Sequence, residues 1–534
     1  MTFRAVIHES DTLLVGCPCS HALSGISGIV HMHENNSEFL PRLGPQVGAD
    51  PVTLRPFETL RSPSGGPLKV AILSDFVRVS YANGAVFQTR SLYRSLRECG
   101  HQVTVIGPCD PDAHPSELAP GTIQVPSRPM HAYPGVHVPL PLDSQLFDVD
   151  RWDFDIVFAQ TTSLLAEFGV WLRKMKGIPL LCVNTTHLPS AYEVLLPGWL
   201  SGVPGFREGV DFCLRGPFEQ LFCNIYNESD GLVVLSDGLK KYWTERGVKV
   251  PVHVIPRAVS LDVFAGASRE DPYAELLARA GLAANSTRLV CAGRHTREKA
   301  QDRAIQIFAS RILPAAPNTV LFMVGNGPDT AYYRQVAASH GVLERVLFVG
   351  EVPFRDMPNY YEHGDVFVHT SLSETFGNVL GEALWSGMAV VAMADGMGAS
   401  SQVEDRVNGY LIAPGGSSCR EGDARFGDAV VSLVTDRLAR RRFGREAARL
   451  ARLRSAPHVV ERLTADAFRA ARRHVGETLP VPDMHRSRLQ QLATTAKHAH
   501  RWALIMSGVY LTGRLRPSQE RAGKGASLHP SFAR

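Results

Sequence analysis

Two acidic and two basic residues in the second half of the chain have types and spacings that could do chemistry. Glu374 and Glu382 lie eight residues apart in SETFGNVLGEALWSG, and Arg294 and Lys299 lie five apart in GRHTREK. Carboxylates accept hydrogen bonds from sugar and ribose hydroxyls, while an arginine fork and a lysine ammonium can clamp a diphosphate. Either pair alone also fits a solvated surface, so the elements that position these residues must decide between the two interpretations.

Short apolar strands alternate with helices through most of the chain. In the first half we expect strands at 68–75, 103–107, 154–159, 179–184, 231–235 and 252–255. After an Ala/Gly-rich stretch the pattern restarts, with strands expected at 288–292, 320–324, 346–349, 366–369 and 389–394. Strands that are apolar on both faces predict parallel sheets covered by helices. The sequence therefore predicts an α/β fold with two doubly wound, Rossmann-like domains that face a central cleft.

This alternation also predicts the domain boundaries. Residues 1–67 end in the linker composition RSPSGGP, and we expect them to be a poorly ordered extension. The first domain is expected at 68–265 and the second at 266–455. A helix at 456–475 should return to the first domain, and a basic tail should follow at 476–534.

The four residues follow expected strands, where a doubly wound sheet binds its ligands. Arg294 comes after the strand at 288–292, and Glu374 after the strand at 366–369. Between Glu374 and Glu382, the backbone amides from Phe376 onward open a helix and could meet a phosphate.

The first half carries a weaker signal. Asn83-Gly84 follows the first strand and opens a helix, so its backbone could approach an anionic ligand. A simple turn fits those residues equally well. The sequence contains no G-x-G-x-x-G fingerprint, which counts against a dinucleotide-dependent dehydrogenase.

The order and placement of these motifs resemble the retaining nucleotide-sugar glycosyltransferases of the GT-B fold, specifically glycosyltransferase family 4. The similarity spans residues 68–475. The motifs that carry it are Glu374-x7-Glu382, Gly293-Arg-x4-Lys299, Val324-Gly-Asn-Gly-Pro328, Val254-Ile-Pro256 and Asn408-Gly-Tyr-Leu411.

The resemblance implies a role for each matching residue. Arg294 and Lys299 match the positions that hold the donor diphosphate. Glu374 matches the carboxylate that faces the transferred sugar, and Glu382 the one that contacts the ribose. His187, in Val-Asn-Thr-Thr-His, resembles the active-site histidine, although a structural histidine is the alternative. Further donor contacts are implied for Asn83, Gly84, Phe376, Gly377 and Asn378.

The chain departs from the family pattern at three places. Many relatives have Pro-Asn-Gly-Val-Asp where this chain has Pro256-Arg-Ala-Val-Ser260. Ala300 replaces the usual glycine after the lysine, and Ser401 replaces a frequent glutamate. These departures leave the donor open between a UDP-sugar and a GDP-sugar.

The activity implied by the resemblance is transfer of a sugar, with retention, from a nucleoside-diphosphate sugar to a hydroxyl of a glycan, a lipid or a small molecule. No Asp-x-Asp site occurs in the right place, so we expect neither a metal nor a cofactor. A GT-B sugar-nucleotide epimerase or hydrolase is the enzymatic alternative. A non-catalytic nucleotide-sugar-binding module is the other, and the intact set of Arg294, Lys299, Glu374 and Glu382 argues against it.

Composition bounds the partners and the compartment. The 534 residues are 44% hydrophobic and carry a net charge of only +4, so no nucleic-acid partner is expected. Nine scattered cysteines fit a reducing cytoplasm.

The basic tail holds the apolar run Trp502–Leu511, which is too short to span a bilayer. That run could lie on the inner face of a membrane, or it could pack on the protein's own surface.

Overall fold

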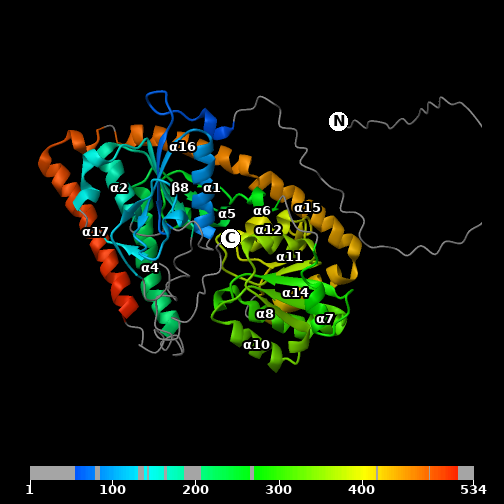
Figure 1. The fold of residues 1–534 in the computed structure, drawn as a ribbon. Coiled ribbons are helices and arrows are strands. Elements are labelled where there is room, and N and C mark those ends of the chain that lie inside the picture. The colour runs from blue at the N-terminus through cyan, green and yellow to red at the C-terminus, as the bar shows by residue number, and fades with distance from the viewer. Residues whose placement is uncertain are drawn as a thin grey trace, which may run out of the picture. The chain divides into compact units, whose positions relative to one another are not determined.

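The structure is a computed structural model that describes residues 55–77, 84–129, 137–140, 144–160, 165–185, 206–264, 270–415, 419–479 and 481–514 (Figure 1). Two residues expected in the site, Asn83 and His187, lie outside these ranges. Most of the expected extension and the end of the basic tail lie outside them as well. Both sheets described below belong to one compact unit, Leu54–Arg534.

The first domain is built on a parallel sheet in the order β3-β2-β1-β6-β7-β8-β9. Alternate residues of each strand face opposite sides, so Val70 and Ile72 of β1 face α1 and α16, whereas Ala71 and Leu73 face α2. The strands are β1 (Lys69–Ser74), β2 (Gln102–Pro108), β3 (Ile123–Val125), β6 (Ile156–Gln160), β7 (Leu180–Asn184), β8 (Gly231–Val234) and β9 (Val252–Val254). The covering helices include α1 (Gly84–Glu98), α2 (Leu165–Lys176), α4 (Phe206–Asn227), α5 (Asp237–Glu245) and α16 (Pro457–Thr478).

The second domain repeats the plan with the order β12-β11-β10-β13-β14-β15, again all parallel. Its strands are β10 (Thr287–Ala292), β11 (Thr319–Val324), β12 (Val346–Gly350), β13 (Val366–His369), β14 (Ala389–Met393) and β15 (Gly409–Ile412). Its helices include α8 (Gln301–Ile307), α10 (Thr330–Ser339), α11 (Met357–Glu362), α12 (Asn378–Trp385), α13 (Gly398–Gln402), α14 (Cys419–Thr435) and α15 (Arg437–Ser455). The two sheets confirm the predicted α/β fold.

Details of the elements differ from the sequence expectation. Helix α8 begins at Gln301 and not at Lys299, because Ala300 has a left-handed backbone (φ 47°) between the short turn Arg297–Lys299 and α8. A small antiparallel pair, β4 (Ser127–Pro129) with β5 (His137–Pro139), was not expected.

Segments near both ends of the described chain pack on the first domain. Phe57, in the turn Pro56–Thr59, is buried and stacks on Phe468 of α16 with ring centroids 6.5 Å apart. Figure 1 shows α16 passing over the first domain and α17 (Arg488–Arg514) running beside α2. Part of the expected extension and part of the expected tail therefore contribute to the first domain's core.

Helix α17 is held to α2 by polar contacts as well as by a tryptophan. Trp502 is fully buried and its indole N–H donates to the Pro139 carbonyl (3.2 Å). The indole of Trp171 on α2 donates to the Thr495 hydroxyl (3.0 Å). The first residue of the apolar run therefore packs on the protein itself.

Candidate active site

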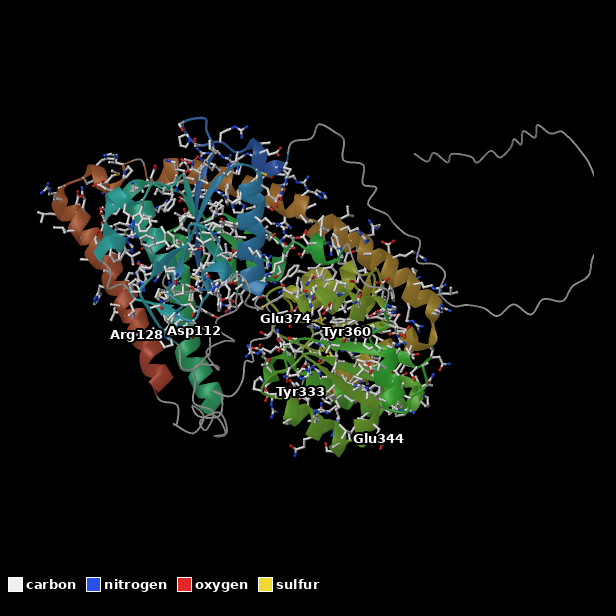
Figure 2. The ribbon with its side chains drawn as sticks, in the orientation of Figure 1. Asp112, Arg128, Tyr333, Glu344, Tyr360 and Glu374 are labelled. Atoms are coloured by element: carbon white, nitrogen blue, oxygen red, sulfur yellow. The ribbon has the colours of Figure 1, made fainter. Side chains whose placement is uncertain are left out.

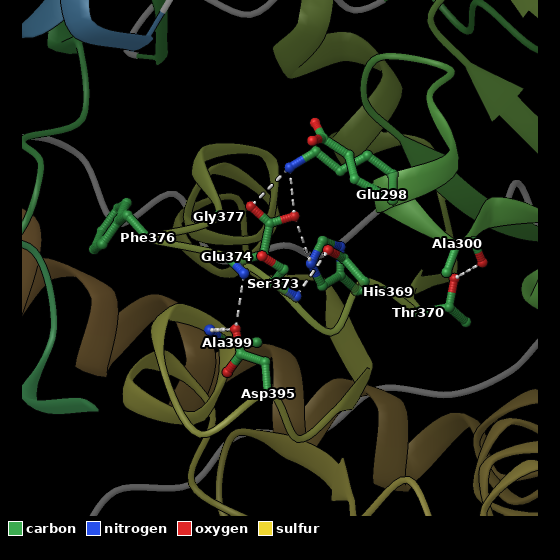
Figure 3. A network of polar contacts seen from close by, with 12 residues as sticks. Glu298, Ala300, His369, Thr370, Ser373, Glu374, Phe376, Gly377, Asp395 and Ala399 are labelled. Carbon is green, nitrogen blue, oxygen red and sulfur yellow. Dashed lines mark hydrogen bonds and ion pairs between the residues drawn. The ribbon is translucent and has the colours of Figure 1, made fainter. Parts of the chain in front are cut away.

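Glu374 occupies a turn that the surrounding backbone holds in place. The turn leads from the carboxyl end of β13 into α12, and Gly377 (φ 81°) lets the chain change direction there. The Glu374 amide donates to an Asp395 carboxylate oxygen (3.2 Å), and the Gln402 side-chain amide donates to two carbonyls of the turn. These contacts hold the backbone of the turn, and Figure 3 shows the one between Glu374 and Asp395.

An ion pair joins the loops that follow β10 and β13. Lys299 Nζ lies 2.8 and 3.0 Å from the two carboxylate oxygens of Glu374, which is buried. His369 Nε2, at the end of β13, lies 3.4 Å from the same carboxylate. Burial favours the neutral acid, but Lys299 and His369 outweigh it and hold the pKa of Glu374 well below its usual range. Glu374 is therefore a carboxylate at neutral pH.

The position of this pair follows from the sheet order. Strands β10 and β13 are neighbours, and chain connections leave them in opposite directions. In a doubly wound sheet, ligands bind outside the carboxyl ends of the strands at such a point. Figure 2 shows Glu374 on the opposite side of the second domain from Glu344, which precedes β12.

Glu382, eight residues further along, has a different environment. Its carboxylate is partly buried and accepts a hydrogen bond from the buried Tyr361 hydroxyl of α11 (2.8 Å). Burial raises the pKa of Glu382 to about 7, against the opposing effect of that hydrogen bond. The two carboxylates therefore have pKa values displaced in opposite directions.

The turn around Glu374 also contacts the first domain. The Thr375 hydroxyl donates to the carbonyl of Thr185, just after β7 (3.2 Å). The Phe376 ring is buried in the same apolar cluster as Leu235 and Leu239 of the first domain. The side chain of Phe376 is thus a packing group, and only its backbone remains for a ligand.

Comparison with known proteins gives the family. Residues 82–263 match the family described as Glycosyltransferase Family 4, and residues 274–450 match Glycosyl transferases group 1. A D-inositol 3-phosphate glycosyltransferase of Nocardia farcinica is 30% identical over 61% of this chain and 70% of its own. The chain belongs to glycosyltransferase family 4.

Other similar proteins agree with this assignment. An alpha-monoglucosyldiacylglycerol synthase of Streptococcus pneumoniae is 25% identical over 61% of this glycosyltransferase and 71% of its own length. The crystal structure of Anabaena HepE with UDP and glucose shares the fold, with a TM-score of 0.57 and 18% identity over 75% of this chain and 98% of that one. The predicted GT-B architecture and glycosyltransferase function are confirmed.

The structure brings together some of the expected site residues of this glycosyltransferase. Lys299 and Glu374 are in direct contact, and Gly377, Asn378 and Glu382 continue the same turn and helix. Arg294 lies in the loop after β10 with its side chain exposed. Gly84 begins α1, as the sequence predicted, whereas Asn83 and His187 lie outside the described ranges. The individual roles remain predictions.

Sequence reasoning missed four residues that shape this site. His369 ends β13 and Asp395 lies two residues after β14, so the rule that placed Glu374 could have found them. Tyr361 and Gln402 gave no comparable signal, because each reaches the site from a helix by its side chain alone.

Two classes of feature are absent from the described ranges. No group of three His, Cys, Asp or Glu side chains there is arranged to hold a metal ion. No helix within the same ranges is long and apolar enough to cross a membrane.

Proposed function

We propose that this glycosyltransferase transfers the sugar with retention of anomeric configuration and without a metal ion. The observation that carries the proposal is the Lys299–Glu374 pair at the point where β10 and β13 diverge. It places a cation and an ionised carboxylate side by side at the edge where a bound donor would present both its diphosphate and its sugar.

In the proposed reaction the diphosphate leaves on the face where the acceptor enters. The bond from the anomeric carbon to the diphosphate oxygen breaks, and the acceptor oxygen bonds to that carbon from the same side. The acceptor proton passes to the departing diphosphate. Lys299, Arg294 and the first amides of α12 would stabilise the charge on the leaving group. Glu374 would hold the sugar hydroxyls and face the positive charge that develops on the sugar ring.

A panel of UDP- and GDP-sugars tests this proposal. Transfer to an acceptor with the anomeric configuration kept, measured by NMR, is the expected result, and it should persist in excess chelator. Turnover without acceptor would favour the epimerase or hydrolase, and binding without turnover would favour the binding module. Activity that requires a divalent ion would contradict metal independence.

We also propose a lipid-linked acceptor reached from a membrane surface. A relative is named as an alpha-monoglucosyldiacylglycerol synthase, and the outer face of α17 suits such a surface. Leu489, Leu492 and Leu504 of this helix are 80%, 66% and 59% exposed. Residues 488–514 contain no acid. Anionic lipids would attract the exposed Arg488 and Lys497, whereas Arg501 pairs with Glu228 of the protein itself (3.0 Å).

Co-sedimentation with anionic vesicles tests the membrane contact. The double variant Leu489→Asp/Leu492→Asp should lose vesicle binding, because both side chains are exposed and the change adds two like charges to the lipid-facing side. Leu438→Asp on α15, where the leucine is 76% exposed, is the matched control and should bind as wild type does. Equal binding of all three proteins would contradict the contact.

A further inference from the structure

Arg257 is an unusual residue in an unusual place. It follows β9, in the segment Pro256-Arg-Ala-Val-Ser260 that departs from the family pattern. Its Nη1 donates to the side-chain oxygen of Asn378, the first residue of α12 (3.2 Å). A guanidinium that leaves the last strand of the first domain therefore reaches the start of the helix that carries Glu382.

This guanidinium is poorly satisfied. Its Nε is enclosed by protein and has no hydrogen-bond partner, although a guanidinium carries five N–H donors. Within the part of the chain that the structure describes, the Asn378 contact is its single hydrogen bond and no carboxylate oxygen pairs with it. Burial lowers the pKa of Arg257 to about 10, with Glu374 acting in the opposite direction. Burying a cation that has no partner is unfavourable. A bound ligand that accepts hydrogen bonds from the guanidinium would remove that cost.

The groups around Arg257 are themselves mostly positive. Glu374 is the carboxylate that acts on Arg257, and it is already bound by Lys299 and His369. The first amides of α12 have no acceptor within their own helix, and the helix dipole is positive at that end. Cations and N–H donors thus converge on the start of α12, and the Glu374 carboxylate that acts on Arg257 is shared with Lys299.

We propose that Arg257 is a third cation of the donor site and donates to the diphosphate of the bound nucleotide sugar. The proposal rests on the proposed function, and it adds a residue from the segment between the domains to the Arg294 and Lys299 pair. An asparagine at this position could offer only a neutral amide. The chain's departure from the family pattern would then be a feature of donor recognition rather than a neutral change of turn.

Calorimetry with UDP, GDP and their monophosphates tests this inference on the full chain. Arg257→Ala should weaken binding of the preferred nucleoside diphosphate on the order of tenfold or more, since a hydrogen-bonded charge is lost. The monophosphate should lose less affinity, because it lacks the terminal phosphate. Arg257→Lys should lie between wild type and Arg257→Ala, since it keeps the charge and loses the fork.

The control is Arg94→Ala. Arg94 bonds Asp262 in the same connecting region but lies on the outer part of α1. The Arg94→Ala variant should bind nucleotides as wild type does. If Arg257→Ala does not fold, Arg257→Lys and Arg257→Gln provide the comparison in its place.

Three results would overturn the inference. Unchanged diphosphate affinity in a folded Arg257 variant would show that the residue only braces α12, with a lower melting temperature as its sole effect. An equal loss for monophosphate and diphosphate would place it away from the terminal phosphate. Wild-type protein that binds neither UDP nor GDP would overturn the proposed function itself and this inference with it.

Discussion

Glu374 and Glu382 lie eight residues apart and have opposite surroundings. Glu374 sits in a turn and contacts Lys299 and His369, so it is ionised despite being buried. Glu382 sits inside α12 beside the Tyr361 hydroxyl, has no ion pair within the described ranges, and burial raises its pKa to about 7. Two chemically identical side chains are thereby suited to different tasks. One offers a permanent negative charge, and the other a charge that depends on pH and on what binds beside it.

The largest expected effect comes from removing the permanent charge. Glu374→Gln keeps the side-chain volume but loses the carboxylate that we propose faces the sugar. We expect kcat to fall on the order of 10²–10³-fold, the loss typical of one preorganised electrostatic contact. Steady-state kinetics measure the fall, and circular dichroism checks the fold. Wild-type turnover in a folded variant would remove Glu374 from the site.

The next largest effect is expected from the two basic residues assigned to the donor diphosphate. Arg294→Ala and Lys299→Ala should each weaken binding of a free nucleoside diphosphate on the order of tenfold or more, because each removes a charged donor from one ligand. The double variant should lose less than the product of the two single losses, since both residues share that ligand. Calorimetry on the three variants measures these affinities. Wild-type affinity in both single variants would refute the proposal that Arg294 and Lys299 hold the diphosphate.

The pH-dependent charge of Glu382 predicts a smaller effect, a change in nucleotide-sugar affinity with pH. Ribose hydroxyls donate to a carboxylate, so affinity for a nucleotide sugar should rise as the pH passes upward through about 7. The sign follows because the raised pKa leaves Glu382 mostly protonated below that pH. Glu382→Gln should flatten the profile. A nucleotide sugar is the right probe, since its diphosphate diester does not titrate in this range. An unaltered profile in Glu382→Gln would assign the titration elsewhere.

Tyr361→Phe should have the smallest effect. The hydroxyl opposes the rise in the pKa of Glu382, so its loss should move the midpoint of that profile upward. Turnover well above the shifted midpoint should change little, because Glu382 is then ionised in both proteins. An unchanged midpoint of the pH profile would show that Tyr361 does not affect the pKa of Glu382.

The sequence predicted the fold well because periodicity is a local signal. Apolar strands and the residues that follow them were enough to predict Lys299 and Glu374 at one edge of the second sheet. Their direct contact was not predictable, since it depends on the left-handed backbone at Ala300 and on the depth to which Glu374 is buried.

Contacts between distant segments were the part that the sequence could not supply. Helix α17 buries Trp502 together with polar groups such as His498, so its buried side shows no apolar period. Tyr361 and Arg257 reach the site across 21 and 121 residues of chain, respectively. Pairings of that range arise from tertiary packing and leave no mark on local composition.

The chain passes between the two domains twice, and the two crossings touch. One crossing follows β9, and the other joins α15 to α16 at Ala456. The Val259 amide of the first crossing donates to the Ser455 carbonyl of the second (3.1 Å), and Val259 and Ala456 share an apolar cluster with Trp385. We expect two joints side by side to act as a hinge with one axis when the domains rotate against each other. Rotation about an axis moves atoms in proportion to their distance from it, so groups near this hinge, such as Arg257, would keep their neighbours while more remote loops open and close.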